Sequence, residues 1–182
     1  MAASWRTAYF KQALADYELF LMLENAEDVP LCHRLHYLQM MTEKMAKGFK
    51  TEEGGGEYAH THVAFVPFLK IAKSRPEIMQ ACGIRTKEQF HAYLNGLYDL
   101  AAAVQDLAPA QANRADIGVN PEYPWETPKG IVAPVDFDFP GIDLNAKNAK
   151  LNKLMTFIKH CFEIAEREMG QAWKSVFLPR IL

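Results

Sequence analysis

The chain is short of the features that mark secreted, membrane-spanning and disulfide-bonded proteins. Its three cysteines, Cys32, Cys82 and Cys161, lie far apart and form no C-x-x-C pair, which argues against a disulfide framework and favours a reducing compartment. The longest apolar run covers only residues 19–23, and the first residues lack the apolar stretch of a signal peptide. We therefore expect a cytoplasmic protein with no membrane partner.

Motifs for common cofactors are also missing. The glycine run at 54–56 lacks the G-K-[ST] of a P-loop, and its acidic neighbours would repel a phosphate group. The sequence contains no dinucleotide-binding fingerprint and no Ser–His–Asp signature, so we expect no cofactor. A net charge of −2 gives the whole molecule no general attraction for nucleic acid or for a membrane surface.

What the sequence does have is helical periodicity. Its 182 residues, of which 49% are hydrophobic, are enough to bury a substantial core, and we expect one domain over residues 1–182. Apolar side chains recur at spacings of three and four, whereas the alternation of a strand is absent. The spacing predicts helices over 5–24, 31–49, 59–74, 86–104 and about 143–173. Together they predict an all-α fold, an up-down bundle of four long helices plus short accessory helices.

Several residues mark where the predicted helices begin and end. The S-x-x-E at 74–77 and the T-x-x-Q at 86–89 are capping boxes, in which side chains bond free N–H groups of a first turn. Gly48 and the glycines after it are expected to end the second helix. Pro67 is expected to kink or split the third.

A proline-rich connection, residues 109–141, precedes the last helix. It holds six of the ten prolines, so we expect it to be irregular. It is also rich in large apolar side chains, which favours a segment packed on the bundle over a free linker. These side chains are Tyr123, Trp125, Ile131, Val132, Phe137 and Phe139.

The polar side of the helix over 31–49 is the first candidate site. It lies opposite Leu35 and Leu38. An exposed methionine there suits adaptable contacts, and lysines with histidines could meet phosphates or an acidic partner. The alternative is a solvated face whose charges only pair along the helix. The candidate binding residues on this side are His33, His36, Met40, Lys44 and Lys47.

A metal site on the same helix is disfavoured. Cys32, His33, His36 and Glu43 could supply ligands, but they do not follow the H-E-x-x-H or C-x-x-C patterns of zinc sites. The histidines at 60–62 could supply more, but nothing in the sequence brings them close. We expect no metal.

Three short motifs resemble those of HEPN (higher eukaryotes and prokaryotes nucleotide-binding) domains. Gln39, Glu43, Lys44 and Lys47 match the Q-x-x-x-E-K-x-x-K pattern of their second helix. The segment 61–69, which begins Thr-His, resembles the T-H-x-L that opens their third helix. The segment 122–125, Glu-Tyr-Pro-Trp, is similar to an R-Y-P element that follows their fourth helix in one branch.

The resemblance implies a small helical bundle that often dimerises, in prokaryotic toxin–antitoxin, defence or nucleotide-linked systems. On this basis we expect a non-catalytic binding or assembly module that forms a homodimer. Its ligand would be a nucleotide, a nucleic acid or a partner protein. The contact surface would combine the polar side of the second helix with Tyr123 and Trp125.

The resemblance also implies an alternative, because active HEPN members are metal-independent ribonucleases with an arginine four to six residues before a histidine. One such pair is present, Arg85 and His91. Two features weaken it. Thr86 stands where active members have Asn, Asp or His, and six helical steps turn the chain through about 240°, which points the two side chains apart.

Overall fold

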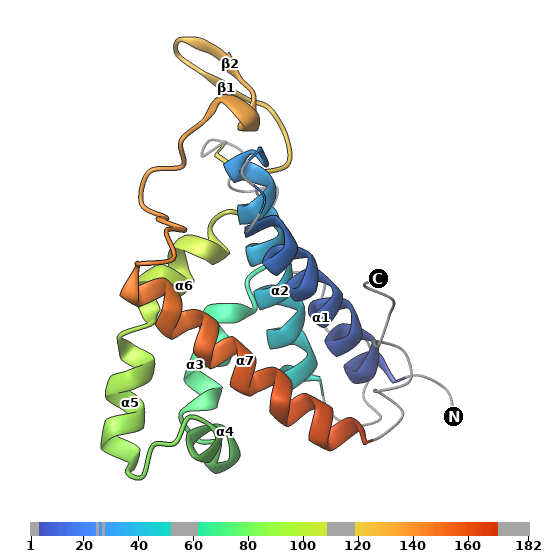
Figure 1. Cartoon of the computed structure of the whole chain (residues 1–182), viewed down its shortest axis with the longest axis vertical. Coiled ribbons are helices and arrows are strands. Elements are labelled where there is room, and N and C mark those ends of the chain that lie inside the picture. The colour runs from blue at the N-terminus through green and yellow to red at the C-terminus, as the bar shows by residue number, and fades with distance from the viewer. Residues whose placement is uncertain (1–3, 25, 27, 52–61, 109–118, 171–182) are drawn as a thin grey trace.

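The fold is described from a computed structural model (Figure 1), which covers residues 4–24, 26, 28–51, 62–108 and 119–170. The described part is mostly helical, which confirms the all-α class. Its elements are α1 (Trp5–Glu24), α2 (Leu31–Lys50), α3 (Phe65–Ala72), α4 (Pro76–Ala81), α5 (Lys87–Asn95), α6 (Tyr98–Gln105), β1 (Trp125–Thr127), β2 (Gly130–Val132), the 3₁₀ helix η2 (Pro134–Asp136) and α7 (Ala149–Met169).

Helix α2 is the centre of the structure. It packs against α1, α3, α6 and α7, while α7 runs diagonally across the front of Figure 1. The apolar positions predicted to face inward, among them Leu35, Leu38 and Met45, are fully buried. Because neighbours surround α2, the side predicted to be polar and solvated is largely covered as well.

A chain of aromatic rings joins four of these helices. Phe49 of α2 meets Phe10 of α1 edge-to-face at 4.9 Å between ring centroids and stacks on Phe68 of α3 at 5.0 Å. Phe68 also lies 6.1 Å from Phe157 of α7. Buried aromatic contacts of this kind contribute roughly 1 kcal/mol each beyond the area they bury.

The prediction that Gly48 ends the second helix is wrong. α2 continues to Lys50, and Gly48 lies inside it. A β-carbon at this position would stand 2.6 Å from the ring of Phe10, so the glycine allows α1 and α2 to approach closely. The reason for this glycine is packing rather than termination.

Helix ends match the sequence prediction in part. The Thr86 side chain accepts a hydrogen bond from the Gln89 amide and caps α5 as predicted. Ser74 does not cap α4, because its hydroxyl donates to the Ile71 carbonyl instead. Gly83, at φ +69°, closes α4 in a Schellman motif, in which its amide and that of the next residue bond carbonyls of the last turn.

Three predicted helices are shorter than expected. The helix predicted over 86–104 breaks at Gly96 into α5 and α6, although its apolar positions stay buried. In the third, described residues before Phe65 are not helical, and Pro67 sits in the first turn of α3, where its missing N–H costs nothing. The last helix starts at Ala149, where the Asn148 side chain accepts bonds from two free amides.

The connection before α7 is less irregular than predicted. β1 and β2 form a two-stranded antiparallel ribbon with Trp125 opposite Val132 and Glu126 opposite Ile131. We call residues 119–139 the hairpin segment. The ribbon stands above the helices at the top of Figure 1, while η2 packs against α2. No helix in the described ranges is long and apolar enough to cross a membrane.

Candidate functional site

The polar residues of α2 gather around one buried carboxylate. Glu43 accepts hydrogen bonds at 2.7 Å from the Gln39 amide and the Lys47 ammonium. Its Oε2 also lies 2.8 Å from Nδ1 of His62, just before α3. We call Gln39, Glu43, Lys47 and His62 the Glu43 cluster. It unites residues from two of the three sequence motifs. The fold brings His62 close to α2, a contact that nothing in the sequence indicates.

The cluster satisfies a charge that would otherwise be costly to bury. The Glu43 side chain is 5% exposed. Burial on its own would raise the pKa of this carboxyl, but hydrogen bonds from Lys47 and His62, together with their positive charge, outweigh it and lower the pKa below the ordinary 4.5. Glu43 is therefore ionised at neutral pH, and His62 donates through Nδ1 to an ionised carboxylate.

Lys44 is also engaged inside the molecule. Its ammonium donates to Asp16 of α1 at 2.7 Å, and Gln12 donates to the other oxygen of the same carboxylate at 3.2 Å. Asp16 is buried. Lys44 and Lys47 therefore join α2 to its neighbours and to Glu43, and neither presents a free ammonium to a phosphate group.

The other predicted residues of this side lie in different surroundings. His33 is exposed and Met40 is half-buried. His36 is half-buried, with Nδ1 2.9 Å from Oε1 of Glu122, which is ion-pair distance without hydrogen-bond alignment. This contact connects α2 to the hairpin segment. Cys32, considered with them as a ligand, is buried in the core.

An aromatic cluster supports the hairpin segment. The ring of Trp125 meets Phe137 edge-to-face at 5.1 Å, and Phe137 meets Phe139 in the same way at 5.1 Å. The buried Asn120 side chain accepts bonds from the amides of Glu122 and Tyr123, which fixes the turn that leads into β1. Trp125 is therefore a structural support rather than an open contact residue.

The outer side of the segment is apolar and exposed. Tyr123 is 60% exposed, Ile131 81% and Val135 56%. Because strand neighbours alternate between faces, Ile131 and its partner Glu126 point away from the face that carries Trp125. Of the two aromatic residues predicted to bind a partner here, only Tyr123 is available at the surface.

Arg85 and His91 are both exposed. Since Thr86 is the cap of α5, Arg85 precedes the helix and the helix does not fix its direction. The first hydrophobic residue between them, Phe90, is buried in the core. The structure places Arg85 just before the cap of α5 and His91 inside the helix.

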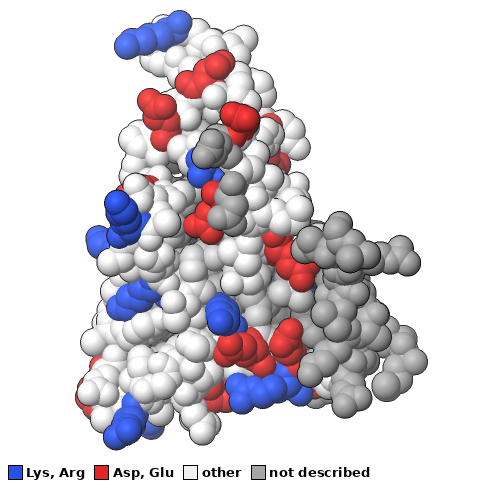
Figure 2. All heavy atoms as spheres, viewed as in Figure 1, with Lys and Arg blue, Asp and Glu red and all other residues white. Residues whose placement is uncertain are grey.

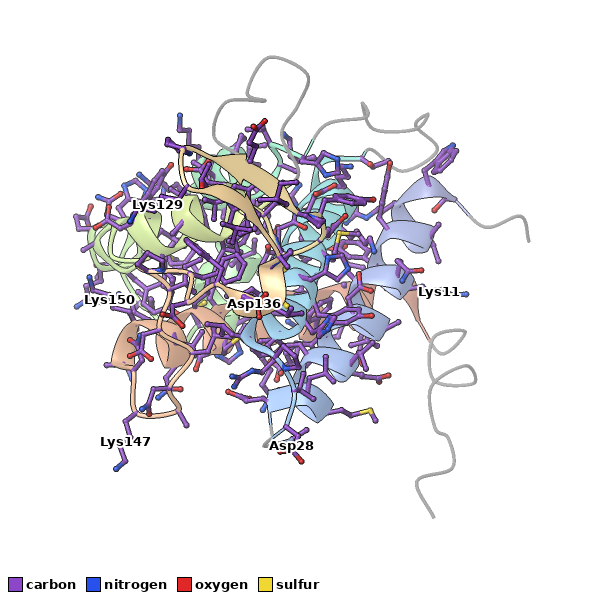
Figure 3. The ribbon with its side chains drawn as sticks, turned by 90° about the horizontal axis from the view of Figure 1, so that it is seen from above. Lys11, Asp28, Lys129, Asp136, Lys147 and Lys150 are labelled. Carbon is purple, nitrogen blue, oxygen red and sulfur yellow. The ribbon has the colours of Figure 1, made fainter. Side chains whose placement is uncertain are left out.

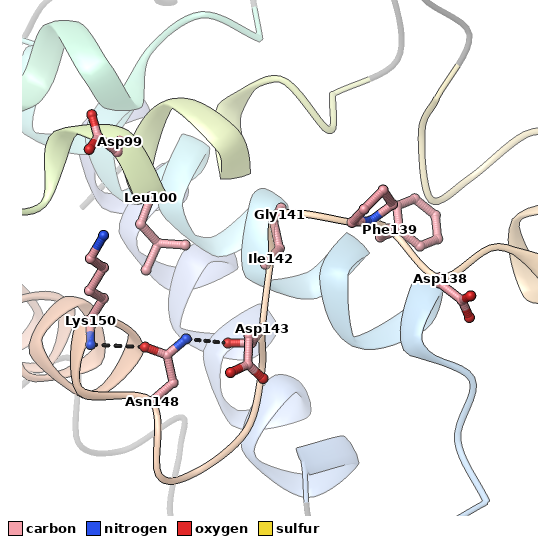
Figure 4. A pocket seen from close by; sticks show the side chains of 10 residues that line it. Asp99, Leu100, Asp138, Phe139, Gly141, Ile142, Asp143, Asn148 and Lys150 are labelled. Carbon is pink, nitrogen blue, oxygen red and sulfur yellow. Dashed lines mark hydrogen bonds between the residues drawn. The ribbon is translucent and has the colours of Figure 1, made fainter.

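A shallow pocket lies between α6, the loop before α7 and the start of α7 (Figure 4). Leu100, Phe139 and Ile142 supply its apolar wall. Asn148 accepts from the Lys150 amide and donates to the Asp143 carbonyl, so its polar atoms hold the loop and cap the helix. None of the predicted binding or catalytic residues lines this pocket.

The described residues contain no group of three or more His, Cys, Asp or Glu placed to hold a metal ion. Comparison of the chain with models of protein families, with curated proteins and with solved structures finds no match. The function must therefore be inferred from the residues themselves.

Two features of the site were not predicted from the sequence: the contact between Glu43 and His62, and the exposed face of the hairpin. The first depends on a return of the chain through 19 residues, for which the sequence holds no distance information. The second did leave a signal. The order Trp-Glu-Thr-Pro-Lys-Gly-Ile-Val at 125–132 places turn-forming residues between two strand-forming runs, which is a hairpin pattern.

Proposed function

We propose that the chain is a non-catalytic, HEPN-like binding and assembly module whose partner is a protein. The observation that carries the proposal is the exposed face of the hairpin segment, with Tyr123, Ile131 and Val135 at the surface above a fixed aromatic base. Exposed branched and aromatic side chains that are close in sequence and rigidly supported are typical of contact surfaces.

The internal pairing of the α2 lysines favours a protein as the partner over a nucleotide or RNA. Lys44 is paired with Asp16, and Lys47 with Glu43. A phosphate bound there would have to break both pairs and leave two buried carboxylates without their lysine counter-charges, each at a cost of several kcal/mol. In this proposal the polar side of α2 therefore holds the fold together, and the surface that contacts the partner is the hairpin segment alone.

The finer expectations from the HEPN resemblance remain part of the proposal. They are the up-down arrangement of four helices, a homodimer and use in the cytoplasm. What supports the resemblance is that Gln39, Glu43 and Lys47 of one motif and His62 of another form a single hydrogen-bonded cluster. Because residues of both motifs bond to the same buried carboxylate, the two motifs would share one structural role.

A comparison of captured proteins tests the proposal. The tagged wild-type chain and an Ile131→Ser, Val135→Ser double variant are cross-linked in cells, and the captured proteins are identified by mass spectrometry. Ile71→Ser is the control, because Ile71 is an exposed apolar residue of α3. The helix α3 lies away from the hairpin in Figure 1. We expect a protein captured by the wild type and the control to be lost in the double variant. Equal capture by all three would contradict the proposal.

The ribonuclease remains the second candidate, because the position of Arg85 outside α5 removes the objection that a straight helix separates it from His91. In this case the purified chain would cleave RNA in EDTA, and both Arg85→Ala and His91→Ala would abolish cleavage without loss of helicity. We expect no cleavage. Cleavage that depends on both residues would replace the binding module with the enzyme.

A further inference from the structure

The hairpin segment is acidic as well as apolar. It holds four carboxylates, at Glu122, Glu126, Asp136 and Asp138, and a single basic residue, Lys129. Glu126, Asp136 and Asp138 are exposed, and none of them pairs with a basic residue elsewhere in the described part of the chain. Figure 2 shows red side chains gathered in the upper part of the molecule, below the blue one at the tip.

Two of these charges lie next to exposed apolar side chains. Glu126 is the cross-strand neighbour of Ile131 on the outward face of the ribbon, and Asp136 follows Val135 directly in η2. In Figure 3, which looks down on the hairpin, Lys129 lies at the turn of the ribbon and Asp136 at its base over the bundle. An apolar centre within a charged rim is the usual composition of a protein contact surface.

The ribbon also offers backbone hydrogen bonds. Its sheet has only two strands, so each strand has an edge whose outward N–H and C=O groups have no third strand in the described structure. An extended peptide can bond such an edge, and its alternate side chains then lie over the neighbouring residues.

From these observations we propose that the hairpin segment binds a basic, apolar segment of a partner protein, which adds to the ribbon as an extended strand. The inference rests on the proposed function and names the chemistry of the partner. Because successive side chains of a strand point to opposite faces, the outward face of the added strand would carry both a lysine or arginine near Glu126 and an apolar side chain against Ile131. Further side chains of these two kinds would meet Asp136, Asp138 and Val135. Opposite charges around the apolar centre select this partner and steer its approach.

The same charges argue against two other occupants. A nucleic acid would bring phosphates against three unpaired carboxylates, which repel them. A second copy would bring two acidic segments together, with only one lysine in each to offset four carboxylates. A basic segment is attracted by the three exposed carboxylates, which outnumber the single lysine.

Selection from a display library of random octapeptides tests the inference. The wild-type chain is immobilised, and enriched peptides are sequenced. We expect enrichment of peptides that carry Lys or Arg together with Val, Ile, Leu or aromatic residues on the same face of an extended strand. A synthetic peptide from the enriched set is then titrated by fluorescence anisotropy against three variants, which are Ile131→Ser, the triple variant Glu126→Gln, Asp136→Asn, Asp138→Asn, and the control Glu88→Gln on α5.

The expected pattern separates charge from apolar contact. Because it removes three exposed charges that pair with the peptide, the triple variant should weaken binding roughly tenfold or more and flatten its salt dependence. Ile131→Ser should weaken it by a similar factor with the salt dependence kept. The control should bind as the wild type. Circular dichroism of each variant checks that the helices are intact.

Three results would overturn the inference. One is enrichment of peptides without basic residues, or no enrichment above the bare support. Another is unchanged affinity in both variants. The third is an Ile131-dependent dimer in analytical ultracentrifugation, which would assign the surface to a second copy. The proposed function would still hold if the hairpin segment formed a dimer or bound a neutral partner. If no interaction of the chain depended on Ile131, both the proposed function and this inference would be contradicted.

Discussion

Glu43 and His62 are 19 residues apart in the chain, and Nδ1 of the histidine lies 2.8 Å from Oε2 of the glutamate. The contact joins the middle of α2 to the residue three places before α3. The Glu43 side chain is buried, whereas His62 is 43% exposed, so the pair runs from the interior to the surface. It fixes the position of the residues just before α3 against the middle of α2.

Replacing Glu43 tests how much this cluster stabilises the fold. Glu43→Gln keeps the shape of the side chain but removes the charge that Lys47 and His62 share. Because Lys47 would be left buried without its counter-charge, we expect the free energy of unfolding to fall by about 3 kcal/mol. Urea denaturation at neutral pH, followed by circular dichroism, measures the change.

The matched control is Glu163→Gln on α7. Glu163 also contacts a histidine, with Nδ1 of His160 3.0 Å from Oε2, but its side chain is 46% exposed. Exposed pairs contribute little, so the loss should stay within about 0.5 kcal/mol. If the two variants lost equal free energy of unfolding, burial of Glu43 would not strengthen the stabilising effect of its contacts.

The stabilisation by Glu43 should depend on pH in a defined direction. In the folded protein its pKa lies below the ordinary 4.5, so the folded state binds a proton at this site less readily than the unfolded state. The contribution is complete above pH 4.5 and is lost as the pH falls through the folded-state pKa. We expect the difference in unfolding free energy between wild type and Glu43→Gln to shrink below pH 4.5. A difference that grows on acidification would contradict the assignment.

The contact between Lys44 and Asp16 is expected to stabilise the packing of α1 on α2. A double-mutant cycle with Lys44→Met and Asp16→Asn isolates the pair. Because Asp16 is buried and also bonded by Gln12, we expect a coupling energy of about 1 kcal/mol from urea denaturation, larger than for an exposed pair. Zero coupling would mean that Lys44 is free to meet a ligand after all.

The long helices could be predicted from the sequence because their signal is local. Apolar spacing in α1 and α2 marks the side that packs, and the structure confirms both helices within two residues of the predicted ends. Thr86 was recognisable as a cap for the same reason, since its partner amide is three residues away. Local spacing carries information about burial and helix ends.

The candidate site could not be predicted in this way. Lys44 and Lys47 look alike on a helical projection, and only the packing of α1 and the return of His62 decide that both are used internally. The exposed state of Ile131 likewise depends on how the ribbon stands on Trp125 and Phe137. Charge and apolarity are visible in the sequence, but their partners are set by tertiary structure.

Gly48 gives the sharpest test of the packing between α1 and α2. Substitution by alanine inside a helix normally stabilises by up to about 1 kcal/mol. Here the new β-carbon would stand 2.6 Å from the ring of Phe10, which is fully buried. We therefore expect Gly48→Ala to destabilise the protein by about 1 to 3 kcal/mol, the usual cost of overpacking.

Gly96, between α5 and α6, is the matched control. Its backbone is right-handed helical, and the nearest atom to a new β-carbon is the flexible Lys153 ammonium at 2.8 Å, which can move aside. Gly96→Ala should therefore leave the stability unchanged or raise it by up to about 1 kcal/mol, because it restricts the unfolded chain. Thermal and urea unfolding of both variants gives the two signs. A stabilising Gly48→Ala would show that α1 and α2 pack less closely than the structure has them, and the positions of Lys44 and Lys47 against α1 and Glu43 would then have to be revised with it.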